Sequence, residues 1–139
     1  MEAEYTFAMI KPLAFEQNLT GPVLSRIAGA GFRISALKTV KLSYAQASQF
    51  YAVHQGKFFF ENLVTYISSG PVAAIVLEKE NAVSDFRKLI GSTDPGKASK
   101  ETIRHMFGKS KLQNAIHGSD SIESAKRECA YFFSNMERF

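Results

Sequence analysis

The chain has 139 residues, of which 45% are hydrophobic and 22% are charged, and its formal net charge is +4. This length fits a single domain over residues 1–139, and no apolar run approaches the roughly 20 residues of a membrane-spanning helix. The acidic N-terminus lacks the basic-then-apolar order of a signal peptide. Because the single cysteine, Cys129, has no partner for an internal disulfide, we expect a cytoplasmic protein.

The positive charge is concentrated in residues 87–111. This stretch holds seven basic and two acidic residues, a net charge of +5, which leaves −1 for the rest of the chain. Charge confined in this way indicates a local anion site. A solvated lysine-rich loop would have the same composition.

The first half of the chain begins with a strand, a helix and a second strand. Tyr5–Ile10 is a short apolar run, which is typical of a buried strand. Val23 and Ile27 then fall on one face of a helix that Gly31 would end. Alternating residues over Phe32–Leu42 predict the second strand.

Two helices and a third strand follow. Ser43, with Gln46 three residues later, is a capping-box signature for a helix that runs to about Val53. Apolar residues at helical spacing predict another helix over residues 59–67. Val72–Leu77 is strongly apolar and predicts a strand.

The last third contains two further helices separated by a long loop. Asn81 can cap a helix that Gly91 ends, and Asp120 with Glu123 predicts the start of the last helix. Ala130–Phe133 is apolar and predicts a final strand. A long loop inside a small domain is usually functional or disordered.

The order β-α-β-α-α-β-α-β predicts an α+β fold. A ferredoxin-like βαββαβ arrangement fits it, with a four-stranded antiparallel sheet that helices cover on one face.

A phosphate-binding loop is suggested by Gly91–Lys97, which matches most of the pattern G-x-x-x-x-G-K-[ST]. Ala98 stands where that pattern needs a hydroxyl for magnesium, and the segment follows a predicted helix where a true P-loop follows a strand. Gly29 and Gly31 resemble a dinucleotide motif, but the third glycine is replaced by Ile34.

Two other kinds of active site have little support in the sequence. His54, His105 and His117 are widely separated, and Cys129 has no second ligand at metal-binding spacing. A Ser-His-Asp hydrolase remains formally possible, but the chain lacks the G-x-S-x-G elbow.

The segment Asn114–Ser121 contains the strongest candidate for a catalytic residue, His117. Gly118 leaves room for a ligand, and the residues around Ser119 lie at a predicted helix N-terminus, where free N–H groups favour anions. Glu128 lies on that helix and can turn back toward the imidazole to fix its tautomer. A solvated surface carboxylate is the alternative interpretation of Glu128.

The chain resembles the nucleoside diphosphate kinase family over nearly its whole length. The resemblance is strongest in the segment Asn114–Ser121, which is highly specific for that family. The other matching segments, in the family's order, are Thr6–Pro12, Phe50–His54, Phe58–Phe60, Ser69–Val72, Thr93–Pro95 and Thr102–Arg104.

This resemblance implies a ping-pong phosphotransferase with broad base specificity. A nucleoside triphosphate would give its γ-phosphate to Nδ1 of His117, and a nucleoside diphosphate would then take it. Magnesium is the implied cofactor, held mainly by the nucleotide phosphates and water, with no protein ligand assigned. Ser119 and Glu128 would support His117, while Phe59 would stack on the base with Leu63 nearby. The implied phosphate and ribose contacts are Lys11, Tyr51, Arg87, Thr93, Arg104 and Asn114.

Charge and stacking support the same implied roles. Phosphoryl transfer needs positioning and positive charge around the phosphoryl oxygens, which Lys11, Arg87 and Arg104 can supply. Stacking on Phe59 is indifferent to base identity, because every base has a π-face. Without the resemblance, Phe59 could equally well be a core residue, and Tyr51 and Leu63 would be interpreted as core residues.

The chain departs from the usual family pattern in the phosphate-side loop and around the base. Lys111 stands where an apolar residue often faces the base. The other departures are Leu13, Lys57, Phe58 and Glu101.

The resemblance also implies a homo-oligomer built from dimers, either a tetramer or a hexamer. A catalytically silent homologue that binds nucleotides or single-stranded nucleic acid is the alternative function. Nucleic acid is not expected to be the main partner, because His117, Lys11, Arg104 and Asn114 are all intact.

Overall fold

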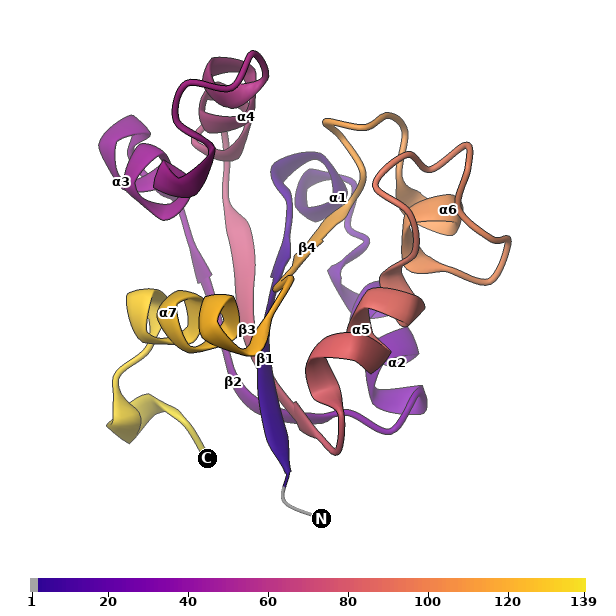
Figure 1. Cartoon of the computed structure of the whole chain (residues 1–139). Coiled ribbons are helices and arrows are strands. Elements are labelled where there is room, and N and C mark those ends of the chain that lie inside the picture. The colour runs from indigo at the N-terminus through magenta and orange to yellow at the C-terminus, as the bar shows by residue number, and fades with distance from the viewer. Residues whose placement is uncertain (1–2) are drawn as a thin grey trace.

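A four-stranded antiparallel sheet lies at the centre of the computed structural model, which describes residues 3–139 (Figure 1). The strands are β1 (Glu4–Ile10), β2 (Arg33–Val40), β3 (Val72–Lys79) and β4 (Ile116–Gly118). They lie in the order β2-β3-β1-β4, and each neighbouring pair is antiparallel. The ferredoxin-like α+β fold predicted from the sequence is therefore confirmed.

Helices connect the strands and follow the last one. Short 3-10 turns lie at Ala52–His54 and Asn135–Glu137. The helices are α1 (Pro12–Glu16), α2 (Thr20–Gly29), α3 (Tyr44–Phe50), α4 (Phe60–Ile67), α5 (Ala82–Ile90), α6 (Ile103–Phe107) and α7 (Ile122–Phe132).

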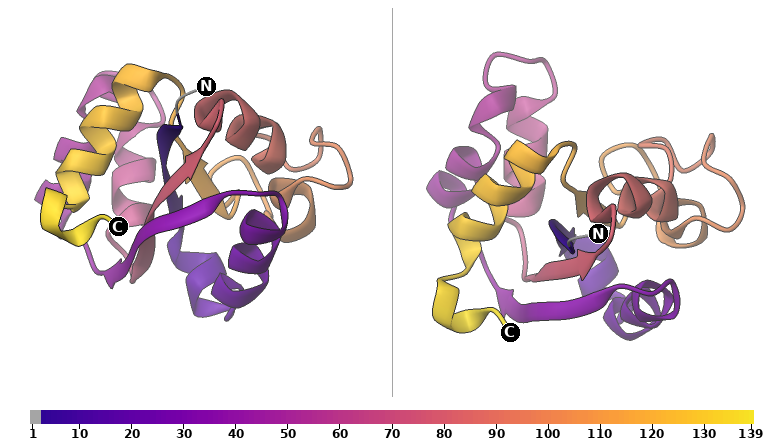
Figure 2. Two further views of the ribbon diagram at one scale, coloured as in Figure 1. Left: turned by 90° about the horizontal axis from the view of Figure 1, so that it is seen from below. Right: turned by 60° about the horizontal axis from the view of Figure 1, so that its bottom comes forward.

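Helices cover both faces of the sheet, so the expectation of one covered face was wrong (Figure 2). Phe7 and Met9 of β1 face a cluster formed with α3, α4 and α7, whereas Ala8 and Ile10 face a cluster formed with α2 and α5. Along β3, all six residues of Val72–Leu77 are fully buried. A continuous apolar run is the pattern of a strand covered on both sides, and it distinguishes β3 from the alternating β2.

The prediction of a final strand at Ala130–Phe133 was also wrong. Residues up to Phe132 belong to α7, and this helix buries Ala125, Cys129 and Phe132 at helical spacing. The fourth strand is β4, which has three residues and pairs with β1. Such a short strand carries no measurable alternation of its own.

The capping box at the start of α3 is confirmed. The Ser43 hydroxyl accepts from the Gln46 N–H at 3.1 Å, and the Gln46 side chain accepts from the Ser43 N–H at 2.9 Å. The helix ends at Phe50, earlier than the predicted Val53, and the chain continues into the 3-10 turn Ala52–His54.

Two other predicted caps differ from the structure. Asn81 precedes α5 in a left-handed conformation (φ 56°), and its side chain makes no capping hydrogen bond. The N-cap of α7 is Ser121, whose hydroxyl accepts from the Ser124 N–H at 3.1 Å. Asp120 instead accepts a hydrogen bond from the Ser124 hydroxyl at 2.7 Å.

Among the helices in residues 3–139, none combines the length and the apolar composition that crossing a bilayer would require.

Candidate active site

His117 lies in the middle of β4, where it pairs with Met9 of the central strand β1. Its ring is surrounded by the rings of Phe7, Phe50 and Tyr51, with centroid distances of 6.0, 5.4 and 5.7 Å. The side chain is 17% exposed. The imidazole is therefore held by packing and can still be reached from solvent.

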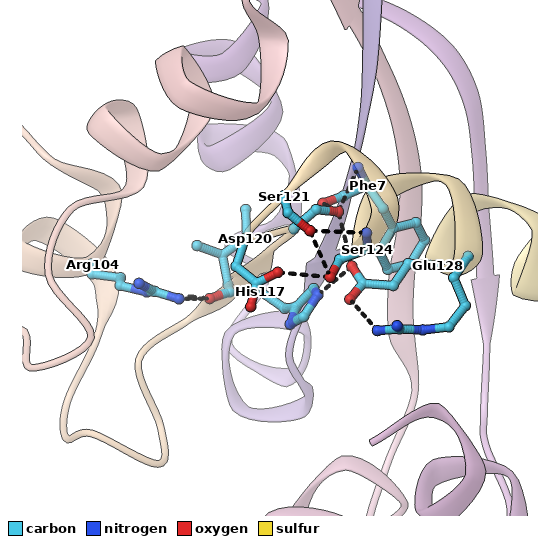
Figure 3. A network of polar contacts seen from close by, with 10 residues as sticks. Phe7, Arg104, His117, Asp120, Ser121, Ser124 and Glu128 are labelled. Atoms are coloured by element: carbon cyan, nitrogen blue, oxygen red, sulfur yellow. Dashed lines mark hydrogen bonds and ion pairs between the residues drawn. The ribbon is translucent and has the colours of Figure 1, made fainter. Parts of the chain in front are cut away.

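A chain of hydrogen bonds connects the imidazole to the backbone of β1 (Figure 3). The Phe7 N–H donates to the Ser119 hydroxyl at 3.1 Å, and that hydroxyl donates to Glu128 Oε1 at 2.8 Å. The same oxygen lies 2.8 Å from His117 Nε2. Because a carboxylate accepts hydrogen bonds, this contact places the ring proton on Nε2 and leaves a lone pair on Nδ1.

Glu128 is buried although it carries a charge. The second carboxylate oxygen, Oε2, lies 3.7 Å from a guanidinium nitrogen of Arg127, whose side chain is half exposed. The pair therefore connects the buried carboxylate with the protein surface, and no sequence pattern indicated Arg127.

Lys11 is a buried amine at the start of the site. Its Nζ donates to Asn114 Oδ1 at 2.8 Å, and Asn114 Nδ2 donates to the Thr93 carbonyl at 3.1 Å. Burial, followed by the charge of Arg104, lowers the pKa of Lys11 to about 7. An anion bound beside this amine would favour its charged form.

Arg104 is fixed by backbone carbonyls on both sides of the site. Its Nε and Nη2 donate to the Ile116 carbonyl at 3.3 and 3.0 Å, and its Nη1 donates to the Gly91 carbonyl at 2.9 Å. A guanidinium has five N–H groups, so two remain for a ligand. Burial, followed by the charge of Arg87, lowers the pKa of Arg104 to about 10, and the group stays charged near neutral pH.

A cavity of about 450 Å³ lies beside His117. Its lining residues come mainly from α4 with the segment before it, and from α6 with the loops around it, which lie on opposite sides of β4 in Figure 1. It has a polar end at His117 and an apolar end at α4. It is lined by Lys11, Tyr51, His54, Phe58, Phe59, Asn62, Leu63, Thr93, Arg104, Lys111, Leu112, Asn114 and His117.

Eight of the residues assigned by resemblance meet in this cavity, from six separate segments of the chain. Glu128 and Ser119 lie behind His117 and do not line it. Arg87 is the exception, because it lines a smaller cavity of about 190 Å³ with Asp120, Arg127 and Glu128. The two cavities share Tyr51, His54 and His117.

Tyr51 has an unusual hydroxyl. The residue is buried, and within residues 3–139 its Oη has no hydrogen-bond partner. Burial, followed by the charge of Glu128, raises the pKa of Tyr51 above its usual range, so the phenol keeps its proton and can donate. A buried donor that lines the cavity and lacks a partner is suited to a ligand oxygen.

Three features near His117 were not found from the sequence. His54 lines both cavities; it ends the matching segment Phe50–His54, but no role was assigned to it. Ala115 has a left-handed backbone (φ 79°), and nothing in its side chain predicts that. A Cβ on Gly118 would lie 2.9 Å from the Ile90 side chain and 3.0 Å from that of Phe86. Glycine at 118 is therefore needed for packing against α5, and it also lines the smaller cavity beside His117.

The side chains of the site do not form a metal-binding cluster. Over residues 3–139, no group of three or more His, Cys, Asp or Glu is arranged to hold an ion. The lining of the larger cavity contains cations, amides and hydroxyls but no carboxylate. This donor set suits the phosphates of a metal–nucleotide complex, with the ion held by the nucleotide.

The site agrees with the comparisons to known proteins. A model of the family "Nucleoside diphosphate kinase" matches residues 4–138. A nucleoside diphosphate kinase of Pasteurella multocida is 53% identical over 139 residues, covering all of both chains. One from Chloroherpeton thalassium is 48% identical over 134 residues, covering 96% of this chain and 95% of that protein.

Solved structures give the same result. The nucleoside diphosphate kinase of Aquifex aeolicus superposes with a TM-score of 0.97 at 42% identity, covering 99% of this chain and 100% of that one. The enzyme of Halobacterium salinarum, solved in complex with CDP, gives a TM-score of 0.95 at 36% identity, covering 99% of this chain and 92% of that one. The chain belongs to the nucleoside diphosphate kinase family, whose members are phosphotransferases.

Proposed function

We propose that this enzyme transfers the γ-phosphate of a nucleoside triphosphate to a nucleoside diphosphate in two steps, through a phosphate carried on Nδ1 of His117. The observation that supports this most directly is the 2.8 Å contact between His117 Nε2 and Glu128 Oε1. It occupies one ring nitrogen with a carboxylate, so the other nitrogen is the available nucleophile.

In the first step, the lone pair of Nδ1 attacks the γ-phosphorus. The N–P bond forms while the bond from phosphorus to the bridging oxygen breaks, and the diphosphate leaves with that electron pair. The proton on Nε2 stays in place, so the phosphorylated ring gains positive charge. Glu128 offsets this charge, and Ser119 holds Glu128 against the ring.

In the second step, a terminal oxygen of the incoming diphosphate attacks the same phosphorus. The N–P bond breaks, and its electron pair returns to Nδ1. The ring is again neutral, with its proton still on Nε2. One site serves both half-reactions because donor and acceptor share the same diphosphate portion.

The polar end of the cavity supplies the phosphate contacts in this proposal. Lys11 and Arg104 bring positive charge, and the unpartnered Tyr51 hydroxyl donates to a phosphoryl oxygen. Positive charge that is already in position stabilises the transition state without reorganisation. Arg87 borders the site from the smaller cavity and adds charge from that side. Magnesium would be held by the substrate's phosphates and water, with no protein ligand assigned, and would neutralise part of the phosphate charge.

The apolar end of the cavity supplies the base contacts. Phe59 precedes α4 at its N-cap position and lines the cavity together with Leu63. Stacking on an aromatic ring accepts every base, so we propose broad specificity with only modest preferences. The tetramer or hexamer implied by the resemblance belongs to this proposal too, and sedimentation equilibrium distinguishes the two.

The test begins with phosphate exchange. Protein mixed with GTP, ADP and magnesium is expected to form ATP, and no ATP at micromolar protein would exclude the kinase function.

Labelling with γ-labelled ATP then tests the intermediate. The expected product is one acid-labile, base-stable phosphate per chain, absent from His117→Gln. A label that persists in this variant would place the nucleophile elsewhere. Circular dichroism of the variant provides the control for folding.

A further inference from the structure

The base end of the larger cavity is formed by two segments that are far apart in the sequence. The start of α4 contributes Phe58, Phe59 and Asn62, and the loop before β4 contributes Lys111 and Leu112. Phe58 is 97% exposed, which places it at the rim. The walls facing the base are therefore mainly apolar, with two polar side chains, Asn62 and Lys111.

Lys111 is the only cation among the base-end lining residues described within residues 3–139. Its ammonium makes none of the ion pairs found in that part of the chain. The nearby Lys57 differs, because its Nζ lies 3.3 Å from His54 Nδ1 and 5.8 Å from the centre of the Phe59 ring. Lys111 is thus available to a ligand at the base end of the cavity.

We propose that Lys111 gives this enzyme a preference for bases that carry a keto oxygen, namely guanine, uracil and thymine, over the amino bases adenine and cytosine. The proposal rests on the phosphate exchange proposed above and adds a substrate preference to it. An ammonium has three donors and no acceptor. Guanine offers an acceptor at position 6, whereas adenine offers a donor there, and the 4-position distinguishes uracil and thymine from cytosine in the same way.

The other lining residues do not counteract this preference. Asn62 carries both a carbonyl and an NH₂ group, so it can pair with keto and amino bases alike. No Asp or Glu lines the cavity within residues 3–139, so no carboxylate is present to accept from an exocyclic amine. The donor-only charge of Lys111 therefore decides the direction of the preference.

The size of the effect follows from the exposure of Lys111. A hydrogen bond from a buried charged group would favour keto over amino bases by about tenfold or more in kcat/KM. Because Lys111 is exposed, solvent weakens this hydrogen bond, and we expect a ratio of roughly fivefold.

The test uses enzyme that has been labelled on its histidine and freed of nucleotide. Loss of label is followed by rapid quench after adding GDP, IDP, ADP or the diphosphate of 2-aminopurine riboside. IDP keeps the 6-keto group without the 2-amino group, and the 2-aminopurine compound has the reverse. We expect kcat/KM for GDP and IDP to exceed that for the other two by roughly fivefold.

Three variants assign the preference to one side chain. Lys111→Met removes the charge at similar length and should bring the ratio close to one. Lys111→Glu should reverse it, because a carboxylate accepts from the adenine amine. Lys109→Met is the matched control, since Lys109 is exposed and does not line the cavity, and it should keep the native ratio.

The outcomes separate the two proposals. A ratio unchanged by both Lys111 substitutions, or IDP reacting like ADP, would overturn the role of Lys111. Equal rates for all four acceptors in the native enzyme would do the same while leaving phosphate exchange intact. An enzyme that takes up no label, or passes it to none of them, would instead refute the proposed function.

Discussion

Nucleotide binding should draw a proton onto Lys11 at pH 8. The pKa of this buried lysine is lowered to about 7, so roughly one free molecule in eleven carries the ammonium at pH 8. Phosphate oxygens beside the amine favour the charged form and raise the pKa in the complex. On binding of ADP, Lys11 is therefore expected to take up about 0.9 proton per site at pH 8, where the phosphates of free ADP are fully ionised, and only about 0.1 at pH 6, where Lys11 is already charged.

Calorimetric titration measures this directly. ADP is titrated at one pH into protein in buffers of different ionisation enthalpy, and the slope of the observed heat against that enthalpy gives the protons exchanged. Arg104 does not contribute, because a pKa of about 10 leaves it charged in both states. Burial, and then Lys57, lowers the pKa of His54, so that ring is neutral in the free protein at pH 8.

Lys11→Arg is the informative variant, because a guanidinium stays charged at every pH used. Its proton uptake at pH 8 should fall close to zero even though binding persists. A slope of zero for the native protein at pH 8, or equal slopes for the native protein and the variant, would refute the reasoning.

Three other substitutions test the framework around the imidazole. Glu128→Gln keeps the side chain's shape and removes its charge, so phosphorylation of His117 should slow by about tenfold to a hundredfold; an unchanged rate in rapid-quench labelling would contradict the role of that carboxylate. Gly118→Ala places a Cβ within 3.0 Å of the side chains of Phe86 and Ile90, so it should lower the free energy of unfolding, measured by urea denaturation, by about 1–3 kcal/mol. An unchanged midpoint would mean that α5 can shift to accommodate the methyl group without loss of stability. Ala115→Gly should raise that free energy by about 0.5–1 kcal/mol, because glycine adopts the left-handed conformation without the strain that alanine carries at φ 79°; a loss of stability would show that no strain is stored there.

Local sequence patterns were enough to predict the helices and strands that are long or have a clear capping motif. The apolar run of β3 and the capping box at Ser43 both appear in the structure. The final strand was wrongly predicted at Ala130–Phe133 because a buried helix end and a short strand have the same apolar composition. Only the period across Ala125, Cys129 and Phe132 distinguishes them. The strand β4 could not be predicted, because three residues are too few for a pattern and its pairing with β1 is a tertiary contact.

The part of the candidate site whose residues lie close together in the sequence could be predicted. His117, Ser119 and Glu128 are close in the sequence, and the contact of Glu128 with the ring was anticipated. The contact between Lys11 and Asn114 spans 103 positions and depends on the packing of β1 beside the loop before β4. The place of Arg87 in the smaller cavity also depends on tertiary structure, and no local pattern indicates it.

The two ends of the larger cavity differ in how their side chains are held. At the phosphate end Lys11, Arg104 and Asn114 are buried and hydrogen-bonded to one another or to the backbone. At the base end Phe58 and Lys111 are exposed, and their replacement removes little that the fold depends on. We therefore expect the residues that contact the two ends of one nucleotide to differ sharply in how well they tolerate substitution. Base preference can drift between relatives, or be re-engineered, at little cost in stability, whereas each change at the phosphate end alters folding and catalysis together.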